Sequence, residues 1–336
     1  MSRDITALVA SMTVDERASL TAGATSWSTT AVPRVGIPEI FVSDGPAGVR
    51  GPQIPGVGRQ VASLNIPCGS ALGATWNPEL VEALGDALGD QARTKACRVL
   101  LAPTVNLHRA PLAGRNFEAY SEDPLLTGKL AAAFIRGVQS HGVATTVKHF
   151  AGNESEHERM TIDSVIDQRA LRELYLLPFE LAVKEGGSLG IMTSYNRLNG
   201  SYNTESQYML ETVLRDEWGF EGFVISDWYA GGTTAGAATA GLDLEMPGPA
   251  RFYGGHLGRA VVKGAVAENL LDAAAHRLLT VFERLGALDD EPRAPIAIDR
   301  PEHRSLARSA AAESMVLLKN EGVLPFDATT VKTIAV

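Results

Sequence analysis

The sequence predicts an α/β protein built on a closed parallel barrel of the TIM-type (β/α)8 kind, and two patterns along the chain support this fold class. Helical patterns, in which apolar residues recur roughly every three or four positions, cover residues 124–139 and 167–185. Short apolar runs followed by polar residues occupy residues 39–44, 99–103, 145–149, 189–195, 223–227 and 242–246. Strands that alternate with helices favour a parallel sheet covered by helices.

The apolar runs also predict where a functional site lies, because in a closed parallel barrel the strand ends that precede helices share one rim. Active sites on this fold are built on that rim from several strands. The polar residues that follow the runs are therefore expected to converge: Asp44, Lys148, His149, Tyr195 and Asp227. An aspartate after a strand is also typical of a turn or a helix cap, so the prediction depends on the repeated pattern and not on Asp227 alone.

The chain is longer than one such barrel requires. Its 336 residues exceed the roughly 250 residues of a typical barrel, and the segment 289–301 has the proline and charge content of a linker. We therefore expect a barrel domain over residues 1–288, a linker over 289–301, and over 302–336 a helix and the first strand of a second, truncated α/β sandwich domain. A short natural tail is the alternative interpretation of the last segment.

Composition and charge narrow the functional classes. With 45% hydrophobic and 21% charged residues, the chain is typical of a folded globular protein. The net charge of −9 disfavours nucleic acids as partners, since phosphate binding needs clustered Lys and Arg. Residues 1–20 lack the apolar core of a signal peptide, and no apolar run approaches the roughly 18 residues of a membrane span. We expect a cytoplasmic protein without a membrane partner, with secretion as the alternative.

No metal or cofactor site is predicted. Cys68 and Cys97 are too few for a disulfide scaffold and are expected to be buried apolar side chains. Residues 154–159 hold several carboxylates and a histidine, but their spacing is not that of a zinc-binding helix. We interpret this segment as a solvated, charged loop.

The residue types expected at the rim suit a sugar. Carboxylates and basic side chains form charge-assisted hydrogen bonds with hydroxyl groups, and an indole ring such as that of Trp228 offers a flat apolar face. A carboxylate below the sugar ring can attack or stabilise the anomeric carbon, which becomes positively charged in the transition state of glycoside hydrolysis. The rim therefore favours a glycosidase.

Several segments then resemble a known family. Residues 43–50, 114–124, 148–154, 192–196 and 224–228 resemble the successive motifs of glycoside hydrolase family 3, in the order of that family. Residues 314–326 resemble the beginning of the family's second, sandwich-like α/β domain. Within the family the chain is most similar to β-glucosidases. The resemblance implies a small β-glycoside as substrate and removal of terminal β-D-glucosyl residues by a retaining, two-step mechanism.

The resemblance also implies roles for individual residues. Asp227 would be the nucleophile, Tyr195 would lie beside it, and Trp228 would form a wall of the pocket. Glu118 and Arg109 would support the pocket without contacting the sugar. The remaining residues would bind the sugar or line its pocket: Asp44, Arg115, Lys148, His149 and Met192. Because adjacent side chains of a strand point to opposite faces, the family's cis non-proline peptide is also expected within residues 148–150.

One catalytic group is missing from this set. A retaining glycosidase needs a second carboxyl group as general acid and base, and in the β-glucosidase branch a glutamate of the second domain supplies it. We expect that glutamate beyond Val336, in a missing C-terminal domain, and expect this chain to be impaired in hydrolysis. The alternatives are a β-xylosidase or α-L-arabinosidase of the same family, a non-catalytic carbohydrate-binding barrel, and a metal-dependent enzyme on the same fold.

Overall fold

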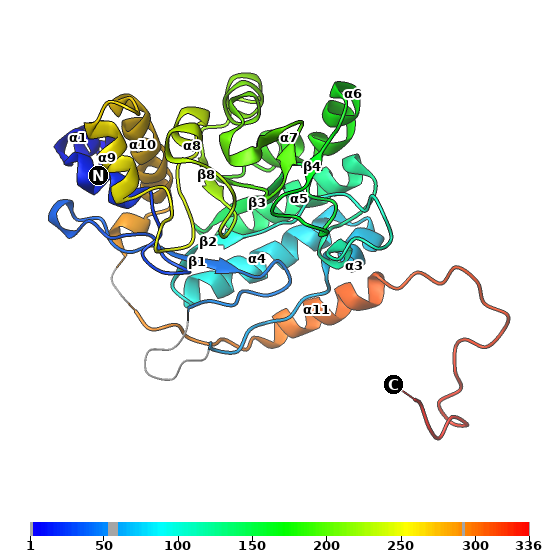
Figure 1. Cartoon of the computed structure of the whole chain (residues 1–336). Helices are drawn as coiled ribbons and strands as arrows, with labels where there is room; N and C mark the ends of the chain where they lie inside the picture. The colour runs from blue at the N-terminus through cyan, green and yellow to red at the C-terminus, as the bar shows by residue number, and fades with distance from the viewer. Residues whose placement is uncertain (1–2, 53–59, 291–292, 336) are drawn as a thin grey trace.

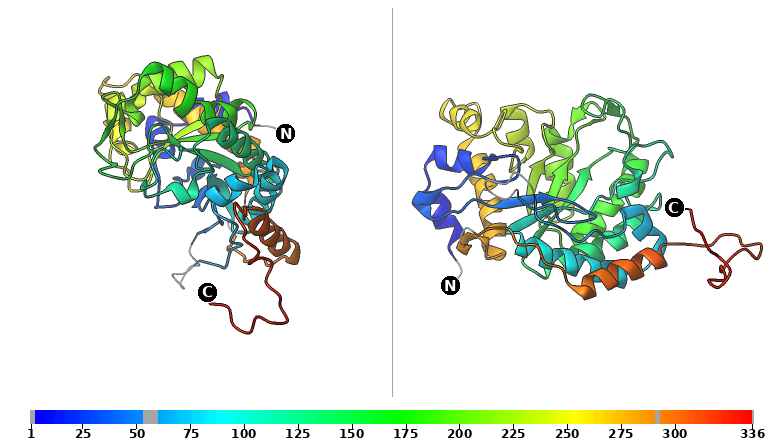
Figure 2. Two further views of the ribbon diagram at one scale, coloured as in Figure 1. Left: turned by 90° about the vertical axis from the view of Figure 1, so that its right-hand side faces the viewer. Right: turned by 90° about the horizontal axis from the view of Figure 1, so that it is seen from below.

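A curled parallel sheet forms the centre of the molecule, with helices around its outside (Figure 1, Figure 2). The computed structural model describes residues 3–52, 60–290 and 293–335. Within them the sheet has five strands, in the order β1 (Phe41–Asp44), β2 (Cys97–Leu101), β3 (Ala144–Phe150), β5 (Gly190–Thr193) and β8 (Phe223–Ser226). Each strand coincides with one of the apolar runs, which confirms the predicted α/β fold class.

Backbone bridges close this sheet into a barrel. Residues 242–246 pair with β8 in parallel direction. On their other side they bridge to Ala22, and the turn over residues 23–29 leads on, through an antiparallel bridge, to Phe41 of β1. The ring of the predicted barrel is thus completed by short segments that do not form regular strands, one of them antiparallel, whereas the members of an ideal (β/α)8 barrel are all parallel.

Proline and glycine explain why the closing segments are short. Pro247 comes directly after residues 242–246 and Pro249 follows two residues later, and neither has an N–H group to donate to a ladder. Gly23 lies so close to the opposite backbone that an added Cβ would be 2.6 Å from the nitrogen of Gly248. The two segments approach each other more closely than residues with side chains allow, so a regular ladder does not continue there.

The two predicted helices form, one of them with an interruption. The helix predicted over residues 124–139 is α5 (Pro124–Gln139), and the Asp123 side chain caps it by accepting hydrogen bonds from the N–H groups of Leu125 and Leu126 at 2.8 and 2.9 Å. The segment 167–185 divides into α6 (Gln168–Ala170), the π-helical turn η3 (Leu171–Tyr175) and α7 (Leu177–Lys184). Pro178 explains the interruption, because it has no N–H to donate to the preceding turn.

Further helices complete the outer layer. Among the described residues they are α1 (Ile5–Ser11), α2 (Val14–Leu20), α3 (Gly69–Thr75), α4 (Pro78–Thr94), η5 (Tyr208–Glu217), α8 (Thr234–Ala240), α9 (Gly255–Val262) and α10 (Glu268–Arg284). Helix α4 packs against α5 and α5 against α7 (Figure 1). Helix α2 packs against α9 and α10. The short strands β4 (Asp163–Ser164), β6 (Arg197–Leu198) and β7 (Ser201–Tyr202) form a separate small sheet.

Both faces of the barrel strands are buried, as the continuous apolar runs predicted. Neighbouring residues of β8 fall into different apolar clusters: Val224 packs in the cluster that includes residues of α4 and α5, and Ile225 in the cluster that includes Leu244 and Met246. This alternation follows from the two-residue period of a strand. The strands are thereby fixed in register, and their ends hold the site residues in place.

The end of the described chain lies partly on the barrel and partly away from it. Helix α11 (Pro301–Glu313) contacts α3 and α4, and residues 314–335 run away from the body without forming helix or strand (Figure 1, Figure 2). The expected helix thus forms, whereas residues 331–335 do not form the expected strand. The domain limits at residues 288 and 301 stay predictions.

None of the helices within residues 3–52, 60–290 and 293–335 combines the length and the apolar character that a membrane crossing requires. The same ranges contain no cluster of three or more His, Cys, Asp or Glu side chains arranged to hold a metal ion.

Candidate active site

All the site residues predicted from the sequence line one cavity of about 190 Å³ at the strand ends. They are Asp44, Arg115, Lys148, His149, Met192, Tyr195, Asp227 and Trp228. Asp44 ends β1, Lys148 and His149 lie near the end of β3, and Asp227 follows β8 directly. The volume is below the roughly 300–1,000 Å³ of sites for drug-sized ligands, so the cavity suits a single sugar ring.

Asp227 has one anchored and one free carboxylate oxygen. Asp227 is only 7% exposed, and its Oδ1 accepts a hydrogen bond from the Trp228 N–H at 2.7 Å. Within the described part of the chain, Oδ2 is buried without any hydrogen-bond partner. Because an unpaired buried carboxylate oxygen is costly, this atom is the place in the cavity where an incoming group gains most from contact.

Burial has the largest effect on the pKa of Asp227. Burial raises the pKa of this carboxyl above its ordinary value of 3.8, and the charges of Lys148 and Arg115 only partly oppose that effect. The two cations thus favour the ionised carboxylate but do not offset the effect of burial. Without them the buried carboxylate would be still harder to ionise.

Asp44 shows the opposite balance. Its Oδ1 lies 2.9 Å from the Lys148 Nζ, and its Oδ2 lies 3.8 Å from the Arg50 Nη1. Burial alone would raise the pKa of Asp44, but the charge and hydrogen bond of Lys148, together with Arg50, outweigh burial and lower it. Asp44 is therefore an ionised hydrogen-bond acceptor, paired with a cation, over the whole neutral range.

Lys148 and His149 both line the cavity although they are neighbours in β3. In a regular strand their side chains would point to opposite faces. The strand is irregular here, with a register shift against β5 between Val147 and Phe150. The peptide bond Lys148–His149 is cis, as the family resemblance implied, and Phe150–Ala151 is a second cis non-proline bond.

Arg115 is held in place by acidic neighbours and by His149. Its Nε lies 2.5 Å from the Glu118 Oε1, and its Nη1 lies 3.9 Å from the Glu156 Oε1. Its Nη2 is 3.2 Å from the Nε2 of His149. Neither Glu118 nor Arg109 lines the cavity, and Glu118 contacts Arg115 directly.

Two tryptophan rings form an aromatic wall, of which the sequence predicted only one. The ring centroids of Trp27 and Trp228 lie 5.2 Å apart at an interplanar angle of 35°, and the Trp228 Nε1 donates to the Ser26 carbonyl at 2.9 Å. Trp27 lies in the antiparallel turn that closes the barrel, where no apolar run or helical pattern pointed to a rim. A flat apolar surface of this kind suits a sugar face or an attached aromatic group.

The segment 154–159 is not the solvated loop that the sequence predicted. Arg159 lines the cavity, where its guanidinium lies 4.6 Å above the Tyr195 ring and its Nη1 contacts the Glu156 Oε2 at 2.7 Å. Glu154 is 9% exposed, and burial raises its pKa to about 7. Because this segment comes directly after β3, its charged side chains could have been predicted to face the rim. The prediction of a solvated loop rested on charge content alone.

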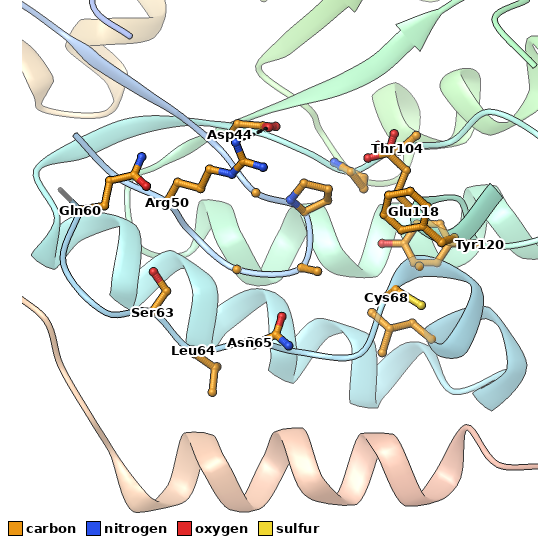
Figure 3. A pocket seen from close by; sticks show the side chains of 18 of the residues that line it. Asp44, Arg50, Gln60, Ser63, Leu64, Asn65, Cys68, Thr104, Glu118 and Tyr120 are labelled. Carbon is orange, nitrogen blue, oxygen red and sulfur yellow. Dashed lines mark ion pairs between the residues drawn. The ribbon is translucent and has the colours of Figure 1, made fainter. Parts of the chain in front are cut away.

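A larger cavity of about 380 Å³ lies on the other side of Asp44. Asp44 lines both cavities, and Figure 3 shows it at the upper edge of the larger one, with Arg50 and Gln60 on one side and Tyr120 on the other. Cys68 also lines this cavity and is only half-buried, contrary to expectation, whereas Cys97 is buried as expected.

Comparison with known proteins gives a consistent result. Residues 29–281 match the model described as "Glycosyl hydrolase family 3 N terminal domain". The chain is 53% identical to a β-glucosidase of Rhizobium radiobacter over 97% of its own length and 40% of the relative's. It is 48% identical to β-glucosidase B of Emericella nidulans over 96% of its own length and 38% of the relative's.

Solved structures agree with the family match. The β-glucosidase 3B of Thermotoga neapolitana in complex with glucose superimposes with a TM-score of 0.92 at 38% identity, covering 97% of this chain and 48% of that one. The chain thus spans about two fifths of the length of these curated relatives and about half of that solved chain. On the match over residues 29–281, this chain belongs to glycoside hydrolase family 3.

Proposed function

We propose that the protein removes terminal β-D-glucosyl residues from small β-glycosides, with Asp227 as the nucleophile of a retaining mechanism. The observation that carries this proposal is the free Oδ2 of Asp227, buried in a cavity of monosaccharide size. Support also comes from the relatives, which are β-glucosidases, and from a structural neighbour that was solved with glucose.

The proposed reaction has two displacement steps. In the first, Asp227 Oδ2 forms a bond to the anomeric carbon while the bond to the leaving oxygen breaks, and a general acid gives that oxygen a proton. In the second, water attacks the same carbon, the ester bond to Asp227 breaks, and the former acid accepts the proton of the water. The sugar leaves with its original configuration, and the carboxylate of Asp227 is restored.

The other cavity residues would bind the sugar hydroxyls. Lys148 and Arg115 offer charge-assisted donors, and Asp44 offers a charged acceptor. A sugar that lacks a hydroxyl at such a position leaves a buried polar group unpaired, which gives the site its selectivity. The rings of Trp27 and Trp228 would contact an apolar face of the substrate.

We infer that the general acid and base comes from outside residues 1–336. Asp44 is the second carboxylate that lines the described cavity, but its ion pair with Lys148 and its lowered pKa make it a poor proton donor. General acid help is typically worth about 10²- to 10⁴-fold in rate. This chain by itself should therefore bind a β-glucoside and hydrolyse it slowly.

Covalent trapping tests the role of Asp227. A 2-deoxy-2-fluoro-β-glucoside with dinitrophenolate as leaving group needs no general acid for its departure, so it should label this chain. Mass spectrometry of the digested protein should find the glycosyl group on Asp227, and Asp227→Asn should remain unlabelled. The exposed Asp216→Asn is the matched control and should label like the wild type. A label on another residue would contradict the proposal.

Leaving-group dependence tests the missing general acid. Hydrolysis of aryl β-glucosides by this chain and by a longer form that contains it should diverge as the leaving group becomes poorer, because only poor leaving groups depend on protonation. Equal rates for both forms with a poor leaving group would show that the acid lies within residues 1–336.

A further inference from the structure

The amide group of Asn106 makes three contacts with His149 and one with Glu154. Asn106 is 6% exposed and lies in the segment that follows β2. Its Oδ1 accepts a hydrogen bond from the backbone N–H of His149 at 2.9 Å and lies 3.0 Å from the ring Nδ1. Its Nδ2 donates to the carbonyl of His149 at 3.1 Å and to the Oε1 of Glu154 at 3.2 Å.

The backbone of His149 determines the positions of the oxygen and the nitrogen in the side-chain amide of Asn106. A carbonyl can only accept and an N–H can only donate, so the Asn106 Oδ1 must face the N–H and its Nδ2 must face the carbonyl. The same Oδ1 then requires a donor at the imidazole. It follows that the Nδ1 of His149 carries the proton and that its Nε2 carries a lone pair.

The unprotonated Nε2 faces the centre of the cavity. The Nη2 of Arg115 lies 3.2 Å from it as a donor, and the Asp227 Oδ2 lies 3.6 Å away. Burial, and the charges of Arg115, Lys148 and Arg159, hold the pKa of His149 well below its ordinary value of 6.5. The ring is therefore neutral at neutral pH and has no proton to give on the side of Asp227.

We propose that Asn106 is a positioning residue that locks His149 in the Nδ1–H tautomer, so that Nε2 accepts hydrogen bonds in the cavity and leaves the Oδ2 of Asp227 free. In the other tautomer the Nε2–H would point at the nucleophilic oxygen and compete with the substrate for it. The role of the sugar in this inference rests on the proposed function, whereas the tautomer itself does not.

Glu154 holds the amide group of Asn106 on the side away from the cavity centre. Its Oε1 accepts from the Asn106 Nδ2 and, at 3.4 Å, from the Leu107 N–H. The amide of Asn106 is thus held between the backbone of β3 and a buried carboxyl group, and it cannot turn without leaving the Glu154 Oε1 or the His149 carbonyl unpaired.

The tautomer can be measured without any catalysis. Nitrogen–proton correlation spectra of this chain with nitrogen-15-labelled histidine, with His149 assigned through the loss of its signals in His149→Gln, report which ring nitrogen is protonated. We expect Nδ1–H in the wild type across pH 5–8. Asn106→Leu should populate the Nε2–H tautomer or bring protonation of His149 into that range. A proton on Nε2 in the wild type, or an unchanged His149 in Asn106→Leu, would overturn the inference.

A rescue variant separates positioning from folding. Asn106→Asp keeps an acceptor for Nδ1–H, and at pH 6 the Glu154 carboxyl is largely protonated and can donate to it, but the donor to the His149 carbonyl is lost. It should keep the Nδ1–H tautomer while raising the pH at which His149 becomes protonated. Asn106→Leu should weaken glucose binding by roughly 5- to 150-fold, the effect of unpairing a buried polar group, and Asn106→Asp should recover part of this loss.

Gln139→Leu is the matched structural control. Its Oε1 accepts from the Thr145 hydroxyl at 3.0 Å and the Leu189 N–H at 3.0 Å at the opposite end of β3. The substitution Gln139→Leu should lower the free energy of unfolding and leave the His149 spectrum and the glucose affinity unchanged. If Gln139→Leu shifted the His149 spectrum as Asn106→Leu does, the effect would be general loosening and the inference would fail. Absence of glucose binding by the wild type would instead contradict the proposed function, while the spectra would still decide the tautomer.

Discussion

At the scale of single residues, the cavity shows how the same side chain acquires different properties from its neighbours. Asp227 is buried and Asp44 is half-buried, and both lie near Lys148, yet the pKa of Asp44 is lowered and that of Asp227 is raised. The difference is contact: the Lys148 ammonium touches Asp44 at 2.9 Å, whereas it acts on Asp227 only through its field. Direct pairing outweighs burial in one case and not in the other.

The field of Lys148 should be visible in the pH dependence of hydrolysis. Asp227 must be ionised to attack, so kcat/KM should rise with pH through its raised pKa. In Lys148→Gln the largest charge that opposes burial is gone, so this acidic limb should move to higher pH. We also expect kcat/KM to fall by roughly 10- to 150-fold at the plateau, because a charged donor to the sugar is lost.

The measurement is the pH profile of kcat/KM for an activated aryl β-glucoside. Lys129→Gln removes a lysine of the exposed pair with Glu185 and should leave the profile unchanged. An acidic limb that stays in place in Lys148→Gln would show that this lysine does not act on the group that titrates.

Glu154 should make the stability of the protein depend on pH. Its pKa is raised by burial from an ordinary value of 4.5 to about 7. Between these values the folded state holds a proton that the unfolded state has lost, so the free energy of unfolding should decrease as pH rises from 4.5 to 7 and stay level above. A shift of this size corresponds to on the order of 3 kcal/mol.

Glu154→Gln should remove that part of the pH dependence, because the amide does not titrate and can still accept from Asn106. Urea unfolding at pH 5 and pH 8 measures it, and all other titrating groups cancel in the comparison of variant with wild type. Equal loss of stability in both proteins between the two pH values would refute the assignment.

The sequence identifies those site residues that end a strand, since the apolar run before them gives their place on the rim. Asp44, His149 and Asp227 are of this kind. Trp27 and Arg159 lie in irregular segments, whose path depends on contacts between residues distant in the chain. Asn106 could not be predicted for a further reason. Its role depends on its contacts with the backbone of His149 on the neighbouring strand, and no local sequence pattern indicates those contacts.

At the scale of elements, the closing segment 242–246 depends on a buried ion cluster. Asp243 is fully buried, and its carboxylate accepts from the Val224 N–H of β8 at 2.7 Å, from Arg215 at 2.9 Å and from Arg277 at 2.7 Å. It therefore joins the closing segment to β8, to η5 and to α10. The sequence pattern of residues 242–246 does not distinguish this irregular closing segment from a regular strand.

Asp243→Asn should destabilise the protein by about 3–5 kcal/mol, because two largely buried guanidinium groups lose their counter-charge. Chemical unfolding with urea measures the change. Glu180→Gln, which breaks the exposed pair with Lys184, is the comparison and should cost less than about 1 kcal/mol. Similar losses in the two variants would mean that the Asp243 cluster does not hold the barrel together.

At the scale of the whole molecule, residues 314–335 leave apolar side chains in water. Leu318 is 92% exposed, Met315 75% and Phe326 56%. Apolar groups that gather on one segment favour association, because contact between molecules removes them from water. The chain was predicted to hold the beginning of a second domain here, and a covering partner for this segment is what that prediction requires.

We expect this chain to self-associate at micromolar concentration through the segment 315–326. Analytical ultracentrifugation should find larger species in the wild type and fewer in the double variant Leu317→Ser/Leu318→Ser. Leu112→Ser, at an isolated position that is 97% exposed, should not change the distribution. A wild type that sediments as a single small species at all concentrations would contradict the expectation.

The way the barrel closes has a consequence for its synthesis. The turn over residues 23–29 leaves the ribosome early, but its neighbour in the ring, the segment 242–246, is added only near the end of the barrel. Until then Ala22, at the start of this turn, and β8 each lack their neighbour in the ring, and open edges attract foreign strands. A nascent chain of this protein therefore stays vulnerable to aggregation, and in need of chaperones, until almost the whole ring has been translated.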